Sequence, residues 1–135
     1  MHCITIFTPT YNREPLIKRL YQSLLTQTRK NFEWLVVDDG STDNTESYFA
    51  DLLNKQQPFL IRYIKQKNGG KHRAINNGVK SASGELFFIV DSDDYLTENA
   101  IEKINQWVTT LDHSHKWAGV AGLRGQSKNR ILGQH

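Results

Sequence analysis

Short runs of strand-forming residues alternate along this chain with segments in which apolar residues recur every three or four positions. The strand-like runs cover residues 3–8, 32–37, 59–64, 86–90 and 117–122, and the helix-like segments begin near residues 14, 43, 74 and 97. This alternation predicts an α/β fold with a mostly parallel sheet, helices on both faces and right-handed connections. Loops that follow parallel strands lie along one edge of the sheet, so residues far apart in the sequence are expected to meet there.

The apolar run Leu86–Val90 is followed at once by the acidic segment Asp91–Asp94. A short, continuous apolar run is typical of a strand buried on both faces, which places the acids at its carboxyl end. Neighbouring carboxylates repel one another, and a divalent cation would compensate them; oxygen ligands suit Mg²⁺ or Mn²⁺ rather than Zn²⁺. A solvated turn that caps the helix beginning near Thr97 explains the same residues equally well.

Two further loops carry candidate nucleotide contacts. The loop Pro9–Arg13 is expected to begin where Pro9 stops the first strand, and its Tyr11 could stack on a base or cover the sheet edge. The turn Asp38–Ser41 contains two carboxylates that could accept hydrogen bonds from a ribose hydroxyl or a base N–H. Taken alone, it also fits an ordinary turn.

The segment Lys67–Arg73 is predicted to be a glycine-rich basic loop. Its Lys71 and Arg73 could bind a diphosphate, although a flexible loop with solvated cations is an equal alternative. His72 has no partner at metal-binding spacing and is interpreted as a surface residue. Together the four loops predict one site for a nucleotide diphosphate bound with Mg²⁺ or Mn²⁺.

Spacing and composition exclude several other functions. The first turn lacks the G-x-G-x-x-G pattern of dinucleotide-binding domains, and the chain lacks the G-x-x-x-x-G-K-[ST] pattern of P-loops. The 135 residues suffice for one domain, and a net charge of +3 is too weak to predict nucleic-acid binding. Cys3 is expected to be a small buried residue, and neither a transmembrane helix nor a signal peptide is expected.

The motifs together resemble the family-2 glycosyltransferases of GT-A fold, which are Rossmann-like. The matching segments are Thr8–Arg13, Leu35–Asp43, Asn68–Lys71 and Phe88–Leu96, and the resemblance covers roughly residues 3 to 112. It implies transfer of a sugar from a nucleotide-diphosphate donor, most often a UDP-sugar, with a divalent metal and inversion at the anomeric carbon. The implied acceptor is a saccharide or a lipid-linked molecule, and the implied location is the cytoplasm, near a membrane.

The resemblance also implies roles for individual residues. Those implied to line the nucleotide are Pro9, Tyr11 and Arg13. Asp39, or its neighbour Asp38, is implied to read a uracil-type base, and Lys71 and Arg73 are implied to contact the donor.

The segment Asp91-Ser92-Asp93 resembles the DxD motif of the family. Asp91 is implied to face the ribose or the sugar, and Ser92 to lie in the same donor site. Asp93 is implied to coordinate the metal, with Asp94 as an alternative ligand.

One departure from the family concerns the catalytic base, which is a carboxylate well downstream of the DxD motif. No Asp or Glu follows Asp112 in this chain. We therefore expect residues 1–122 to form the donor-binding part, and residues 123–135 to be a polar tail or the start of an acceptor region. The chain is then a fragment of a longer enzyme, or else an inactive nucleotide-sugar-binding module. A receiver-type domain fits poorly, because the first strand ends in Thr8-Pro9-Thr10 rather than in acids.

Overall fold

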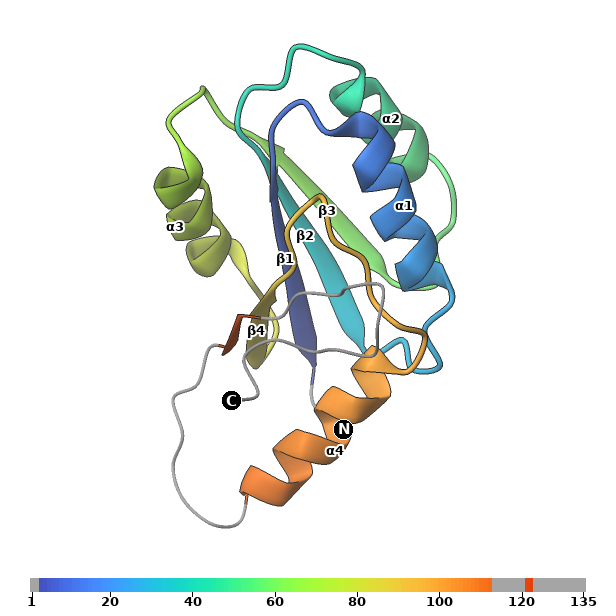
Figure 1. Ribbon diagram of the computed structural model, residues 1–135. Helices are drawn as coiled ribbons and strands as arrows, with labels where there is room; N and C mark the ends of the chain where they lie inside the picture. The colour runs from blue at the N-terminus through green and yellow to red at the C-terminus, as the bar shows by residue number, and fades with distance from the viewer. Residues whose placement is uncertain (1–2, 113–120, 123–135) are drawn as a thin grey trace.

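The computed structural model describes residues 3–112 and 121–122 (Figure 1). Within these residues the elements are β1 (Ile4–Thr10), α1 (Glu14–Leu25), β2 (Phe32–Asp38), α2 (Thr45–Leu53), β3 (Leu60–Lys65), α3 (Lys71–Ser81), β4 (Leu86–Ile89), α4 (Ala100–Asp112) and β5 (Ala121–Gly122). All strand pairs are parallel, in the order β3-β2-β1-β4-β5. The predicted α/β fold is confirmed, and β3 is an edge strand.

Helices cover both faces of the sheet, with α3 on one face and α1, α2 and α4 on the other (Figure 1). Neighbouring residues of a strand point to opposite faces. Ile6 and Trp34 accordingly pack in the larger core with α1, α2 and α4, whereas Phe7 and Leu35 pack in the smaller core with α3. The central strands are therefore buried on both faces, which explains why they read as continuous apolar runs.

The first strand continues through Pro9 to Thr10, so the prediction that Pro9 stops it is wrong. The Phe7 carbonyl accepts from the N–H of Val90 at 2.8 Å, and the Thr10 carbonyl accepts from the N–H of Asp39 at 2.9 Å. By alternation, the missing N–H of Pro9 would face the β4 side, where β4 has already ended. Proline is tolerated in a strand at such a position because no ladder hydrogen bond is lost.

The start of the third helix differs from its prediction. It begins at Lys71, so Lys71 and Arg73 lie in its first turn rather than in a loop. Val79 on this helix is 56% exposed. Gly84 follows the end of the helix at Ser81; a Cβ atom on it would lie 2.6 Å from Thr5 Oγ1, so glycine is needed there for close packing.

Three further expectations concern Cys3, the last predicted strand and membrane-spanning helices. Cys3 is exposed, because it precedes β1 and lies outside the sheet, so the prediction of a buried residue is wrong. The predicted strand at residues 117–122 is described only at Ala121 and Gly122, and residues 123–135 lie outside the described part. None of the helices in the described part is long and apolar enough to cross a membrane.

Glu33 is a buried carboxylate at the amino-terminal end of β2. Its Oε2 accepts from the Thr5 hydroxyl at 2.6 Å and from the N–H of Ser83 at 2.8 Å, and its Oε1 accepts from Arg62 Nη1 at 3.3 Å. Burial raises the pKa of Glu33, but the hydrogen bonds from Thr5, Ser83 and Arg62 outweigh it, so the pKa lies below its ordinary value of 4.5. Glu33 therefore links β1, β2, β3 and the α3–β4 connection.

We expect Glu33→Gln to lower the free energy of unfolding by about 1–2 kcal/mol at pH 7, because an amide N–H₂ must then face a donor. Because the folded pKa is lowered, the carboxylate stabilises the fold above its unfolded pKa, and this contribution is lost as the pH falls through the folded pKa. Urea unfolding measures the free energy of unfolding of Glu33→Gln and of the unsubstituted chain at pH 7 and pH 3. The difference between the two proteins should be smaller at pH 3 than at pH 7. Glu98→Gln, at an exposed side chain, is the control. A difference of equal size at both pH values would contradict the prediction.

Candidate functional site

A cleft of about 300 Å³ lies at the carboxyl edge of the sheet, where the loops after β1, β2, β3 and β4 meet. The residues predicted from the sequence that line it are Pro9, Tyr11, Arg13, Asp39, Lys71, Asp91, Ser92 and Asp93. The lining also includes two residues that the sequence did not single out, Thr10 and Ala74. Thr10 is the last residue of β1, and Ala74 lies on the first turn of α3.

Asp39 is held at the base of the cleft by three donors. Its Oδ1 accepts from Gln66 Nε2 and from the N–H of Gly69, both at 2.8 Å, and its Oδ2 accepts from the N–H of Gly70 at 3.0 Å. Gly70 has a φ of 94°, a conformation that favours glycine. Burial raises the pKa of Asp39, but these hydrogen bonds and the charge of Arg73 outweigh it and lower the pKa below its ordinary value of 3.8. Asp39 is therefore an oriented anion at neutral pH.

Asp38 has a different environment from its neighbour. It is fully buried and is not among the residues that line the cleft. Its carboxylate accepts from the N–H of Ser41 at 2.9 Å and from the Tyr63 hydroxyl, whose pKa is raised by burial and by this hydrogen bond. Of the two candidates for base recognition, the geometry favours Asp39.

The acidic segment after β4 forms a tight turn, closed by a hydrogen bond from the N–H of Asp94 to the carbonyl of Asp91 at 3.0 Å. One carboxylate oxygen of each of Asp91, Asp93 and Asp94 lies within 4.8 Å of the others. An oxygen-only donor set at this spacing fits a hard cation such as Mg²⁺ or Mn²⁺. Across the cleft, Lys71 Nζ lies 3.2 Å from Asp91 Oδ1. Cationic and anionic side chains therefore face each other in one cleft.

Asn12 joins the first two loops, a role that the sequence reading missed. Its backbone has a positive φ of 52°, its N–H donates to Ser41 Oγ at 2.8 Å, and its Oδ1 accepts from the N–H groups of Thr42 and Asp43. These bonds hold the loop of Tyr11, whose side chain is 45% exposed, against the loop of Asp39. Asparagine tolerates positive φ, which is the only sequence signal for this position.

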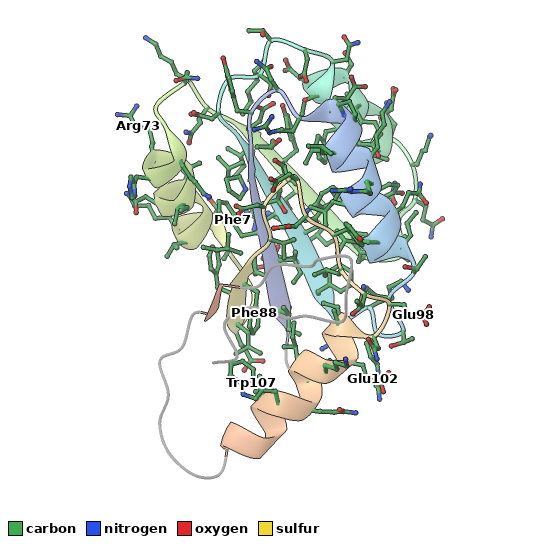
Figure 2. The ribbon with its side chains drawn as sticks, in the orientation of Figure 1. Phe7, Arg73, Phe88, Glu98, Glu102 and Trp107 are labelled. Carbon is green, nitrogen blue, oxygen red and sulfur yellow. The ribbon has the colours of Figure 1, made fainter. Side chains whose placement is uncertain are left out.

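Besides Asp38, two other predicted residues do not line the cleft. Arg73 lies on the first turn of α3 (Figure 2), where its side chain packs against Gly69 and acts on Asp39 through its charge. Asp94 lies in the acidic turn but outside the cleft lining.

Comparison with known proteins gives a consistent result. The family described as glycosyl transferase family 2 matches residues 5–130. The glycosyltransferase GlyG of Streptococcus pneumoniae serotype 4 is 38% identical over 110 residues, which are 81% of this chain and 36% of GlyG. Glycosyltransferase GlyA of the same organism is 37% identical over 101 residues, 75% of this chain and 14% of GlyA. The chain thus spans about a third or less of the length of these curated relatives.

Solved structures agree with the sequence matches. The crystal structure of S. aureus TarS 1-349 in complex with UDP-GlcNAc has a TM-score of 0.73 and 32% identity, and the match covers 80% of this chain and 31% of that one. The mannosyltransferase PcManGT from Pyrobaculum calidifontis, in complex with GDP-Man and Mn²⁺, has a TM-score of 0.73 and 26% identity, with 79% of this chain and 32% of that one covered. The family matches nearly the whole length of this chain, and the solved glycosyltransferase structures share its fold. This chain therefore belongs to glycosyl transferase family 2 and has the GT-A fold.

Proposed function

We propose that this chain is the donor-binding part of a glycosyltransferase that takes a sugar from a nucleotide-diphosphate donor and uses Mg²⁺ or Mn²⁺ as its cofactor. The preferred donor in this proposal is a UDP-sugar. The observation that carries the proposal is the convergence of Asp39, Lys71 and the acidic turn on one cleft. The ligands named for related structures, UDP-GlcNAc and GDP-Man with Mn²⁺, support this class of donor. The donor-binding part comprises residues 1–122 in this proposal.

The nucleoside occupies the end of the cleft at Asp39 and Tyr11. Asp39 is anionic and oriented by Gln66, Gly69 and Gly70, so it accepts a hydrogen bond from the N–H of a uracil-type base. The ring of Tyr11 is exposed at the cleft and stacks on the base.

The diphosphate lies between Lys71, Arg13 and the acidic turn. Both cations line the cleft and reduce the negative charge that develops on the departing nucleotide diphosphate. Asp93, Asp91 and Asp94 would hold the divalent cation, which supplies further positive charge to the leaving group. Arg73 contributes indirectly, through its packing on Gly69 and its charge beside Asp39.

Sugar transfer with inversion also needs a base that deprotonates the acceptor hydroxyl. No carboxylate follows Asp112 in this chain, and we assign no residue to that role. A saccharide or lipid-linked acceptor, and work at the cytoplasmic face of a membrane, stay predictions from the family resemblance.

The proposal is tested by thermal unfolding of the chain with UDP-sugars and GDP-Man, each with and without Mn²⁺. A specific donor binds the folded state, so we expect one nucleotide sugar to raise the melting temperature when Mn²⁺ is present. Failure of every donor to raise it would refute the assignment. Release of free sugar or transfer to an acceptor, measured on the same samples, distinguishes an enzyme from a module that binds without turnover.

Asp93→Asn is expected to raise the dissociation constant for Mn²⁺ about tenfold or more, because one charged ligand is lost. The Mn²⁺-dependent shift in melting temperature with the donor should fall in parallel. Asp93 is exposed, so the melting temperature without ligands should change little. Asp51→Asn, an identical change on the exposed surface of α2, is the control. Unaltered Mn²⁺ affinity in Asp93→Asn would remove Asp93 from the proposed metal ligands.

A further inference from the structure

Ser23 on helix α1 and Gln27, two residues after the end of α1, contact the segment that follows the acidic turn and the start of α4. Ser23 Oγ accepts from the N–H of Leu96 at 3.1 Å, and Gln27 Nε2 donates to the carbonyl of Thr97 at 2.7 Å. Gln27 Oε1 also accepts from the N–H of Ile101 at 3.0 Å. These contacts all involve backbone groups, so they fix the path of the chain after β4 and not only its side chains.

The same attachment continues beyond the end of α1. The N–H of Thr28 donates to the carbonyl of Glu98 at 2.9 Å, and its hydroxyl donates to the Glu102 carboxylate at 2.8 Å. Figure 2 shows Glu98 just before α4 and Glu102 on the first turn of α4, both near the end of α1. The second half of the connection from β4 to α4 is therefore anchored to the end of α1 and to the residues that follow it.

Arg19 lies one turn before Ser23 on α1 and reaches the acidic turn itself. Its Nη2 donates to the carbonyl oxygen of Asp93 at 2.6 Å, and its Cζ lies 4.7 Å from the centroid of the Tyr95 ring. A guanidinium group can donate a hydrogen bond and lie over an aromatic ring at the same time. Arg19 thus contacts the backbone of Asp93 and the side chain of Tyr95, one on each side of Asp94.

The acidic turn brings three carboxylates close together, so contacts that hold its backbone in place affect whether these carboxylates can stay near one another. One carboxylate oxygen of each of Asp91, Asp93 and Asp94 lies within 4.8 Å of the others, and like charges at this distance repel when no cation lies between them. Lys71 compensates Asp91 through its side chain, from α3. Arg19 brings a second positive charge to the turn, from α1, and its hydrogen bond fixes the peptide group that follows Asp93.

We propose that Arg19 is a positioning residue for the metal site: it touches neither the cation nor the donor, and it holds the turn so that the three carboxylates converge before the cation arrives. This inference rests on the proposed function, because it presupposes that the acidic turn binds a divalent cation. Its own content is that part of the metal affinity comes from α1, a helix with no ligand of its own in the cleft.

The experiment measures Mn²⁺ binding to the whole chain, without nucleotide, from the electron paramagnetic resonance signal of free Mn²⁺. We expect Arg19→Ala to raise the dissociation constant roughly three- to tenfold, since a charged hydrogen bond to the turn is lost at an exposed position. Arg19→Lys keeps the charge but not the planar group, and we expect an intermediate value. Arg29→Ala, an exposed arginine beyond the end of α1, removes the same charge and should leave Mn²⁺ binding unchanged.

Two further measurements distinguish positioning from general loss of structure. UDP binding in EDTA reports on the Asp39 end of the cleft and should be equal in Arg19→Ala and the unsubstituted chain. Urea unfolding should show closely similar midpoints. Equal Mn²⁺ affinity in Arg19→Ala, or weaker UDP binding in EDTA in proportion to weaker Mn²⁺ binding, would overturn the role of Arg19 alone. Absence of saturable Mn²⁺ binding by the unsubstituted chain would overturn the metal site itself.

Discussion

Replacing Asp39 by Asn is expected to lower the free energy of unfolding by about 2–3 kcal/mol and to weaken UDP binding at least tenfold. The carboxylate accepts hydrogen bonds from Gln66, Gly69 and Gly70, and an amide must turn its N–H₂ group toward one of these donors. Rotation of the Gln66 amide would not relieve the conflict, because its Oε1 already accepts from Asn77 Nδ2. Stability is measured by urea unfolding and UDP affinity by calorimetry.

The pH dependence gives this prediction a second readout. The folded pKa of Asp39 is below its ordinary value of 3.8, so its stabilising contribution is present above the unfolded pKa and is lost as the pH falls through the folded pKa. The stability difference from Asp39→Asn should therefore shrink between about pH 5 and pH 3. Asp51→Asn, at an exposed position, should show no such difference at any pH. If Asp39→Asn kept full stability and lost only UDP affinity, the structural part of this prediction would be wrong.

Gly78→Ala is expected to destabilise the fold by about 2 kcal/mol or more, although alanine is the better helix former by about 1 kcal/mol. A Cβ atom at position 78 would lie 2.2 Å from Cε1 of Phe7. Phe7 is fully buried and stacks on Phe87 with ring centroids 5.3 Å apart, so it has little room to move. Helix α3 must then shift away from the sheet, and the smaller core opens.

The control is Asn76→Ala, which makes a helix-favouring change at an exposed position of α3 and should be neutral or slightly stabilising. Urea unfolding followed by circular dichroism measures both variants. In the double variant Phe7→Leu with Gly78→Ala, the two effects should be less than additive, since the smaller side chain leaves space for the new methyl group. Strict additivity would show that contact with Phe7 is not the cause.

Local patterns were sufficient to predict the order of the elements and the parallel sheet. The spacing of apolar residues shows which face of a helix or strand is buried, and this spacing can be read directly from the sequence. The strand ends bearing Asp39, Lys71 and Asp91 could be assigned to one edge for the same reason, because consecutive right-handed units leave no other arrangement for their loops. The predictions were wrong where the conformation of a residue depends on a neighbouring strand. Pro9 is an example: β1 continues through it because its missing N–H faces the side where β4 has already ended.

Periodicities of two and of three to four residues in the sequence are enough to predict the sheet, its two faces and the loops that form the cleft. The difference between Asp38 and Asp39, which are adjacent in sequence, emerges only from the fold: Asp38 is buried and accepts from the Tyr63 hydroxyl, whereas Asp39 lines the cleft. The fold also brings Arg19 into contact with Asp93. Such contacts join residues far apart in the chain, and their formation depends on helix placement and side-chain reach, which no local pattern encodes.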